Sequence, residues 1–427
     1  MKRTYLAISI AVGAYILTTG VGAAIFPFSF GRDQLMAYVG HEPNIISGAT
    51  LGSLTYWMLL LVFVVALPTA AVLAGGLIDR PIFSEESKVP IWLPIATALA
   101  MTAYCLYRLS LSGGLNLLTA PWDLTSCYEA KILRRAELQS ALGNFYFAFA
   151  FASLPMLSCY LLARGVMGKN KPALLSFAVL SVVILSLDLA TMQKAPAFIY
   201  LLMVGLTLAL SEFGILRSGI LVLPIAAALF LALSITQFCA AEHVVSPAPF
   251  AEGSRPEGSR PDRLSTFGII AIRMVRSNLL RMAVGFPFYV ETFSDPERRC
   301  GIDPSWLRRV FGEQRCFPPT LIFPKVFPNV TSTTGYQPAP VNVSGYAEAG
   351  PWYALFATFV AGSLLGLISS LGRGRDPAAI VTTVAACVFA YYIAQSSLTG
   401  ALFDAYGLLW LTLPLFILKL SNISRGT

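Results

Sequence analysis

A succession of apolar runs constrains this chain more than any other feature of its sequence. Several runs reach the roughly 20 residues that an α-helix needs to cross a hydrocarbon core of about 30 Å. The alternating strands of about 10 residues that build a transmembrane barrel are absent. The runs are ten in number: Tyr5–Phe28, Leu54–Ile78, Ile91–Leu111, Asn144–Arg164, Ala173–Thr191, Ala195–Leu210, Ile220–Ala241, Trp352–Leu371, Ala378–Ser396 and Gly407–Leu420. The pattern predicts an all-α polytopic membrane protein with about ten transmembrane helices.

The composition agrees with this fold class and excludes several functions. Hydrophobic residues make up 56% of the chain and charged residues 12%, whereas a soluble domain has about 25% charged residues. The net charge of +8 does not indicate nucleic acid, because a membrane protein keeps its Lys/Arg excess in cytoplasmic loops. His41 and His243 are the two histidines of the sequence, which excludes a His-rich metal site. Walker A, paired CxxC and HExxH motifs are absent. We therefore expect no metal, no cofactor and no nucleic-acid partner.

Basic residues in the short loops predict the orientation. If Lys2 and Arg3 are cytoplasmic, every other predicted cytoplasmic segment also has Lys or Arg, and both termini are cytoplasmic. The external loop Ser112–Gly143 is the exception, because it contains Lys131, Arg134 and Arg135. The chain then divides into helices one to seven (1–241), a large periplasmic loop (242–350) and helices eight to ten (351–427).

The large loop has several parts. Residues 252–263 repeat a Gly-Ser-Arg-Pro unit, which is typical of a flexible linker. Residues 264–284 show a helical pattern that places Arg273, Arg276 and Arg281 within about 140° of one another. Residues 285–340 are rich in Pro and aromatic residues, and we expect an irregular cap there with a short helix near 305–311.

The seven cysteines do not form a disulfide framework. Cys105, Cys159, Cys239 and Cys387 lie inside apolar runs, where cysteine acts as a small core residue. A Cys300–Cys316 bridge is plausible if the loop faces an oxidising compartment, but Cys127 on the same side leaves the pairing open.

Ionisable residues at the external ends of the spans are candidates for function. They are Arg108, Asp188, Lys194, Glu242, His243, Glu348 and Asp404. Together with the arginines of the two loops they place both signs of charge around one external vestibule, which suits a doubly charged anion and a proton acceptor.

Simpler roles remain open for each of these groups. Asp188 and Lys194 can pair at the interface. Arg134 and Arg135 can bind lipid headgroups. The three arginines of residues 273–281 can form a solvated face. Glu242 and His243 can be a polar span end.

The chain resembles the O-antigen polymerases, the oligosaccharide repeat-unit polymerases of bacterial inner membranes. The third span ends Ser110-Leu-Ser-Gly-Gly114 before an arginine-bearing loop, as in that family. Lys194-x10-Gly205 is similar to the family's Arg-x10-Gly pattern, with Lys in place of Arg, which removes the bidentate fork to phosphate. Gly345-Tyr-Ala-Glu-Ala-Gly350 is similar to the stretch that ends the family's long loop.

The resemblance implies a membrane-embedded, GT-C-like glycosyltransferase that acts without a metal at the periplasmic face of the inner membrane. The donor would be an oligosaccharide on undecaprenyl diphosphate and the acceptor a second lipid-linked repeat unit. The product would be O-antigen or exopolysaccharide. Its partners would be these lipids, the membrane and a chain-length regulator.

This hypothesis gives each candidate residue a role. Arg134, Arg135, Lys194, Arg273, Arg276, Arg281 and Tyr346 would bind substrate. Glu348 would be the catalytic base, with His243 and Glu242 as alternatives. O-antigen ligase and a lipid-linked oligosaccharide transporter are the competing functions. A scaffold for a synthesis complex is a third.

Overall fold

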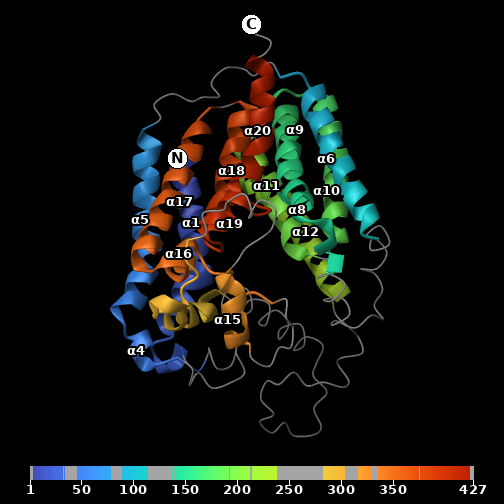
Figure 1. Ribbon diagram of the computed structural model, residues 1–427. Helices are drawn as coiled ribbons and strands as arrows, with labels where there is room; N and C mark the ends of the chain where they lie inside the picture. The colour runs from blue at the N-terminus through green and yellow to red at the C-terminus, as the bar shows by residue number, and fades with distance from the viewer. Residues whose placement is uncertain are drawn as a thin grey trace, which may run out of the picture.

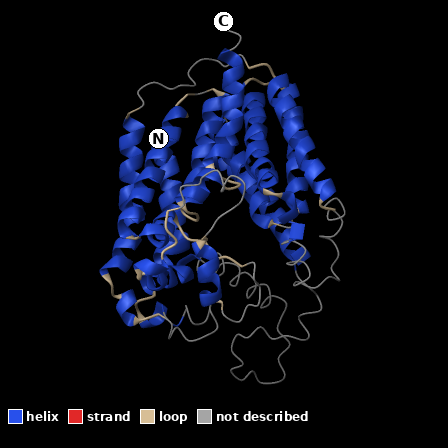
Figure 2. Cartoon of the chain, viewed as in Figure 1, coloured by secondary structure: helices blue, strands red, loops and turns tan. Residues whose placement is uncertain are grey.

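The computed structural model describes residues 3–31, 33, 46–77, 89–113, 137–138, 140–191, 193–211, 214–237, 282–302, 316–327, 335–374 and 376–423. Within these ranges the regular secondary structure is helical, with no strand (Figure 2). The helices lie side by side in a bundle (Figure 1). The start of α1 and the end of α20 lie toward one end of the bundle, and α4 and α15 lie toward the other (Figure 1).

Every apolar run predicted from the sequence is helical over most of its described residues. The first run forms α1 (Arg3–Tyr15), the π-helical turn η1 (Ile16–Gly20) and α2 (Val21–Ile25). The fourth forms α8 (Asn144–Ala148), the π-helical turn η4 (Phe149–Ser153) and α9 (Leu154–Met167). The others form α5 (Leu54–Gly76), α6 (Trp92–Leu111), α10 (Lys171–Ala190), α11 (Lys194–Ser211), α12 (Gly214–Gln237), α17 (Pro351–Leu371), α18 (Pro377–Ile393) and α20 (Leu408–Ile423).

The described residues contain six helices that are long and apolar enough to cross a membrane: Arg3–Ile25, Gly48–Gly76, Asn144–Met167, Lys171–Ala190, Pro351–Leu371 and Leu398–Lys419. Shorter apolar helices lie at Ala195–Ser211, Leu216–Ala226 and Pro377–Ile393. The all-helical architecture is compatible with a polytopic membrane protein.

Local sequence signals set where these helices begin. The Ser53 hydroxyl accepts a hydrogen bond from the Tyr56 amide at the start of α5, and the Asn170 side chain accepts one from the Ala173 amide at the start of α10. Proline occupies the first turn of α10, α17 and α18, where its missing N–H leaves no hydrogen bond unmade.

The most extensive helix pair in the described structure is α5 against α17. Gly362 and Gly366 of α17 lie on the backbone of α5, so close that a Cβ at either position would collide with the Leu67 or Ala71 carbonyl. A Gly-x-x-x-Gly spacing allows this approach because small residues bring two membrane helices into backbone contact.

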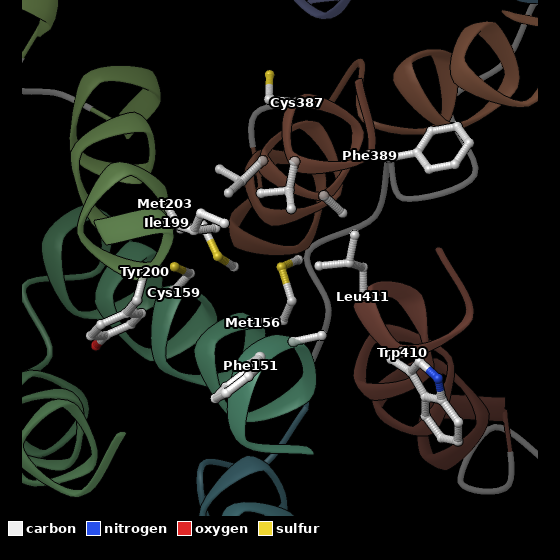
Figure 3. Packing of buried hydrophobic residues seen from close by; sticks show 14 of the residues in the cluster. Phe151, Met156, Cys159, Ile199, Tyr200, Met203, Cys387, Phe389, Trp410 and Leu411 are labelled. Carbon is white, nitrogen blue, oxygen red and sulfur yellow. The ribbon is translucent and has the colours of Figure 1, made fainter. Parts of the chain in front are cut away.

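The main hydrophobic core joins α9 to α11, α18 and α20 (Figure 3). Met156 and Cys159 of α9 lie among Ile199, Tyr200 and Met203 of α11 on one side, and Leu411 of α20 lies on the other (Figure 3). Cys105, Cys159 and Cys387 are buried free thiols, which confirms their predicted role as core residues. Cys239 lies outside the described residues.

A second hydrophobic core lies where the large loop meets the first helices. It combines Phe286, Tyr289 and Phe293 from the helical segment 282–293 with Phe26 and Tyr56 from the first two spans. Phe286 meets Tyr56 edge-to-face at a centroid distance of 4.8 Å. The described part of the loop therefore packs on membrane helices and shares their core.

The prediction that residues 285–340 are irregular is wrong for three segments. Residues 282–293 are helical, Pro296–Arg298 forms the 3-10 turn η5, and Pro318–Val326 forms α15. The two prolines that begin α15 occupy its first turn, where they favour a helix. The short helix expected near 305–311 lies outside the described residues.

Candidate functional site

The centre of the candidate site is α16 (Val341–Ala349), the segment that sequence analysis placed at the end of the large loop. Its residues from Val341 to Glu348 are all buried, on every face of the helix. Gly345 permits this, because a Cβ there would lie 3.1 Å from the Ala354 Cα of α17. Because α16 has small residues and no single apolar stripe, it packs against other elements on all of its faces.

Asn342 ties α16 to the first two membrane helices. Its Nδ2 donates to the Leu59 carbonyl of α5 at 2.7 Å and to the Tyr15 hydroxyl of α1 at 3.4 Å. Tyr15 in turn donates to the Leu60 carbonyl at 3.0 Å. These bonds satisfy buried polar groups that would otherwise destabilise the core by about 1–3 kcal/mol each.

The other end of α16 is bound by the loop. The Cys300 amide donates to the Ala347 carbonyl at 3.1 Å, and the Gly301 amide donates to the Glu348 carbonyl at 2.9 Å. These are carbonyls that the last turn of a helix cannot satisfy internally. Cys300 is also joined to Cys316 by a disulfide with a Cα–Cα distance of 5.5 Å, as the sequence suggested. Residues 299–301 are thereby fixed against the C-terminal turn of α16.

Loss of this disulfide should lower the stability of the protein. Cys300→Ser removes a bridge across a sequence separation of 16 residues, and closure of a loop of that length contributes about 3 kcal/mol. Thermal unfolding in detergent should show a lower midpoint for Cys300→Ser. The wild type in reductant should show the same decrease, and the Cys300→Ser/Cys316→Ser variant should be insensitive to reductant. If Cys300→Ser, the double variant and the wild type in reductant all unfold at the temperature of the untreated wild type, the disulfide does not stabilise the protein.

Arg299 lies over the aromatic ring of Tyr346. The guanidinium carbon is 5.7 Å from the ring centroid, and Nε donates to the Phe293 carbonyl at 3.2 Å. Burial raises the pKa of the Tyr346 hydroxyl, and the neighbouring Arg299 charge opposes that shift. Gly350, with φ of 88°, makes the turn from α16 into α17, and a Cβ there would lie 2.7 Å from Arg299 Nη1. The turn therefore requires glycine for its conformation and for the space that Arg299 occupies.

Two more cations belong to this part of the loop, Arg298 next to Arg299 in sequence and Lys325 within electrostatic reach of Arg298. Lys325 of α15 donates to the Thr292 hydroxyl at 2.9 Å. Burial lowers the pKa of Lys325, and the like charge of Arg298 lowers it further, while Glu291 acts in the opposite direction. Arg298 also forms a solvent-exposed pair with Asp295 at 3.6 Å, and such pairs contribute little. We call Arg298, Arg299 and Lys325 the loop cations.

Glu348 supplies the acidic group of the site. It is 7% exposed and interacts electrostatically with Tyr353 in the first turn of α17. A carboxylate is a group that can accept a proton in general base catalysis. The described residues thus combine a potential base with cations that suit an anionic substrate.

Three of the ten predicted site residues lie in the part of the chain that the structure describes: Glu348, Tyr346 and Lys194. Glu348 and Tyr346 both lie on α16. Lys194 begins α11, and its side chain is outside the described part of the chain. The other predicted site residues also lie outside the described ranges: Arg134, Arg135, Glu242, His243, Arg273, Arg276 and Arg281. Within the described ranges, no group of three or more His, Cys, Asp or Glu side chains could hold a metal ion.

Sequence reasoning missed the loop cations and Asn342. Arg298 and Arg299 directly precede Cys300, and Lys325 follows Cys316 within the next helix. These three residues flank two cysteines that were predicted to pair, and this position in the sequence could have identified them. No sequence signal distinguishes Asn342, because its partners are a backbone carbonyl and a tyrosine of distant helices.

Comparison of the chain with protein-family models, with curated proteins and with solved structures finds no match.

Proposed function

We propose that this protein is a membrane-embedded glycosyltransferase that polymerises undecaprenyl-diphosphate-linked oligosaccharide repeat units at the extracytoplasmic face of the inner membrane. The observation that carries the proposal is the buried Glu348 of α16, whose backbone carbonyl accepts from the Gly301 amide of the loop that carries Arg298 and Arg299. The apolar helices support a substrate that stays in the membrane. The Cys300–Cys316 disulfide supports an extracytoplasmic location, because disulfides persist in oxidising compartments.

The reaction needs a base and a stabilised leaving group. Glu348 accepts the proton of the acceptor sugar hydroxyl while its oxygen attacks the anomeric carbon of the donor. A new glycosidic bond forms, the bond from the anomeric carbon to the diphosphate oxygen breaks, and undecaprenyl diphosphate leaves. The loop cations stabilise the negative charge that develops on the diphosphate. The arginines of residues 134–135 and 273–281 would add to this charge.

Deletion of the gene tests the proposal directly. Loss of a polymerase leaves lipopolysaccharide with a single repeat unit. Undecaprenyl-linked polymer would accumulate instead if the protein were a ligase, and unpolymerised repeat units would remain on the cytoplasmic side if it were a transporter. Bond formation by the purified protein with lipid-linked substrate is decisive, because neither a transporter nor a scaffold makes a bond.

The loop cations provide a variant test. Arg298→Gln and Lys325→Gln should each lower kcat/KM for polymerisation roughly ten- to a hundredfold, because a hydrogen bond to a charged group contributes about 1.5–3 kcal/mol. Arg217→Gln is the matched control, since Arg217 is an exposed cation in the first turn of α12. If all three variants have the same kcat/KM for polymerisation, the loop cations do not take part in the reaction.

A further inference from the structure

Helix α20 contains a proline, Pro414, in its interior. Proline has no backbone N–H, so the carbonyl of the residue four positions earlier, here Trp410, lacks the donor that an α-helix normally provides. Pro414 and Trp410 are both buried, and a carbonyl inside a membrane protein has little water to bond instead. The Trp410 carbonyl therefore needs a donor from another helix.

Ser153 supplies that donor. Its hydroxyl donates to the Trp410 carbonyl at 2.9 Å. Ser153 is fully buried and belongs to η4, 257 residues away in the sequence. In membrane helices, Ser and Thr side chains commonly bond the backbone groups that a proline leaves free. The bond therefore joins the span that contains η4 to α20 at the carbonyl that Pro414 deprives of its donor.

Ser153 itself lies at a second helix break. Pro155, two residues later, deprives the Phe151 carbonyl of its helical donor in the same way. The Leu154 amide donates to the Phe149 carbonyl, five residues earlier, which is the π-helical pattern. Prolines and π-helical turns are the usual causes of kinks in helices. Two spans are therefore each interrupted by a proline at the place where η4 contacts α20.

The first span has a similar bond at its end. Pro27 follows α2 and leaves the Ala23 carbonyl without its helical donor, and the Tyr56 hydroxyl of α5 donates to that carbonyl at 2.6 Å. Because α2 stops there, this bond caps a helix terminus. Helix α20 instead continues beyond Pro414 to Ile423. The bond from Ser153 therefore lies at an internal break, where the parts of the helix on either side can move relative to each other.

Trp410 connects this break with the short helix α19 (Leu398–Phe403). Its indole Nε1 donates to the Phe403 carbonyl at 2.8 Å. Its ring meets Phe145 of α8 edge-to-face at a centroid distance of 5.5 Å. Helix α19 in turn contacts α16 and α17. Residues 398–411, which contain α19 and the first turn of α20, are thus fixed to α8 and η4 through Trp410 and touch α16.

We propose that α20 is hinged at Pro414 and that Ser153 is the latch of this hinge. While the Ser153 hydroxyl bonds the Trp410 carbonyl, residues 398–411 are held against η4. When the hydroxyl rotates away, these residues move relative to the rest of α20, because no backbone hydrogen bond joins Pro414 to Trp410. Helix α19 then changes its packing on α16, so the latch controls one support of that helix. The inference does not depend on the proposed function.

Hydrogen exchange of the full-length protein in phospholipid nanodiscs, followed by mass spectrometry, tests the latch. Ser153→Ala should speed the exchange of peptides that cover residues 398–411 by about three- to tenfold, because one net hydrogen bond is lost. Pro414→Ala supplies the missing N–H, so in that background Ser153→Ala should change the rate by less than about twofold. Ser158→Ala is the matched control: it removes another buried hydroxyl of the same span, which bonds Tyr200 at 2.7 Å, and its effect should be the same in both backgrounds.

Three results would overturn the proposal. An equal effect of Ser153→Ala in both backgrounds shows that the hydroxyl does not replace the N–H that proline lacks. Faster exchange in every helix shows a general loss of stability and no hinge. Unchanged exchange of residues 398–411 shows that Ser153 is not a latch. If Ser153→Ala does not fold, Pro414→Ala decides alone: the completed helix should slow exchange of residues 398–411 about threefold or more, and an unchanged or faster rate excludes the hinge.

Discussion

Glu348→Gln is expected to abolish polymer and leave lipopolysaccharide with single repeat units. Glutamine has nearly the same shape as glutamate, so the packing of α16 and the bond from the Gly301 amide to the Glu348 carbonyl are retained. The amide cannot accept the acceptor's proton. Loss of a general base lowers the rate by about 10²–10⁴-fold, which is enough to remove the ladder of long chains on a polysaccharide gel.

The control for this variant is Glu297→Gln. Glu297 lies in η5 of the same loop and is not buried, so its replacement changes the charge of the loop without affecting α16. Immunoblots of the membrane fraction should show equal amounts of both variants. An unchanged ladder for Glu348→Gln at equal protein level would exclude Glu348 as the base.

Gly366→Ala is expected to destabilise the protein strongly although it adds a single methyl group. The new Cβ would collide with the Ala71 carbonyl, a backbone atom that cannot rotate away. The two helices would have to separate, and overpacking of this kind destabilises by about 1–3 kcal/mol or more. The temperature at which half of the protein is lost from the monodisperse peak in size-exclusion chromatography measures the effect.

Gly13→Ala is expected to leave the stability of the protein unchanged or to raise it. Gly13 lies within α1, and no heavy atom lies within 4 Å of the position that its Cβ would take. Alanine favours a helix over glycine by about 1 kcal/mol, so this variant should be as stable as the wild type or more so. A stability loss of equal size in both variants would show that close contact with α5 is not the cause.

The membrane helices could be predicted from the sequence because the thickness of the bilayer imposes a length that hydropathy reveals. The helical segment 282–293, α15 and α16 could not. The residues of segment 282–293 and of α16 are almost all buried, so no period of apolar residues marks one face. For α15 the proline-rich composition suggested irregular structure, whereas two of its three prolines stand in its first turn.

Some residues of the candidate site could also be predicted from the sequence, and others could not. Glu348 and Tyr346 could be selected because they lie in one short segment of distinctive composition. The loop cations could not, because a disulfide and a helix bring Lys325 to Arg298 from a separate segment. Asp188 was recognised as an ionisable residue near a span end, but its almost complete burial depends on how α10 packs against its neighbours, which no local pattern encodes.

The hydrogen bond from Asn342 to Tyr15 spans 327 residues of sequence, and this has a consequence for biosynthesis. The first two helices leave the ribosome long before α16, so the Leu59 carbonyl and the Tyr15 hydroxyl lack this partner during most of translation. Contacts of such separation form late. A chain arrested within the large loop would therefore insert its early spans without closing the bundle. Membrane-resident chaperones and proteases would encounter that half-assembled state, and its lifetime would depend on how quickly the last third of the chain is made.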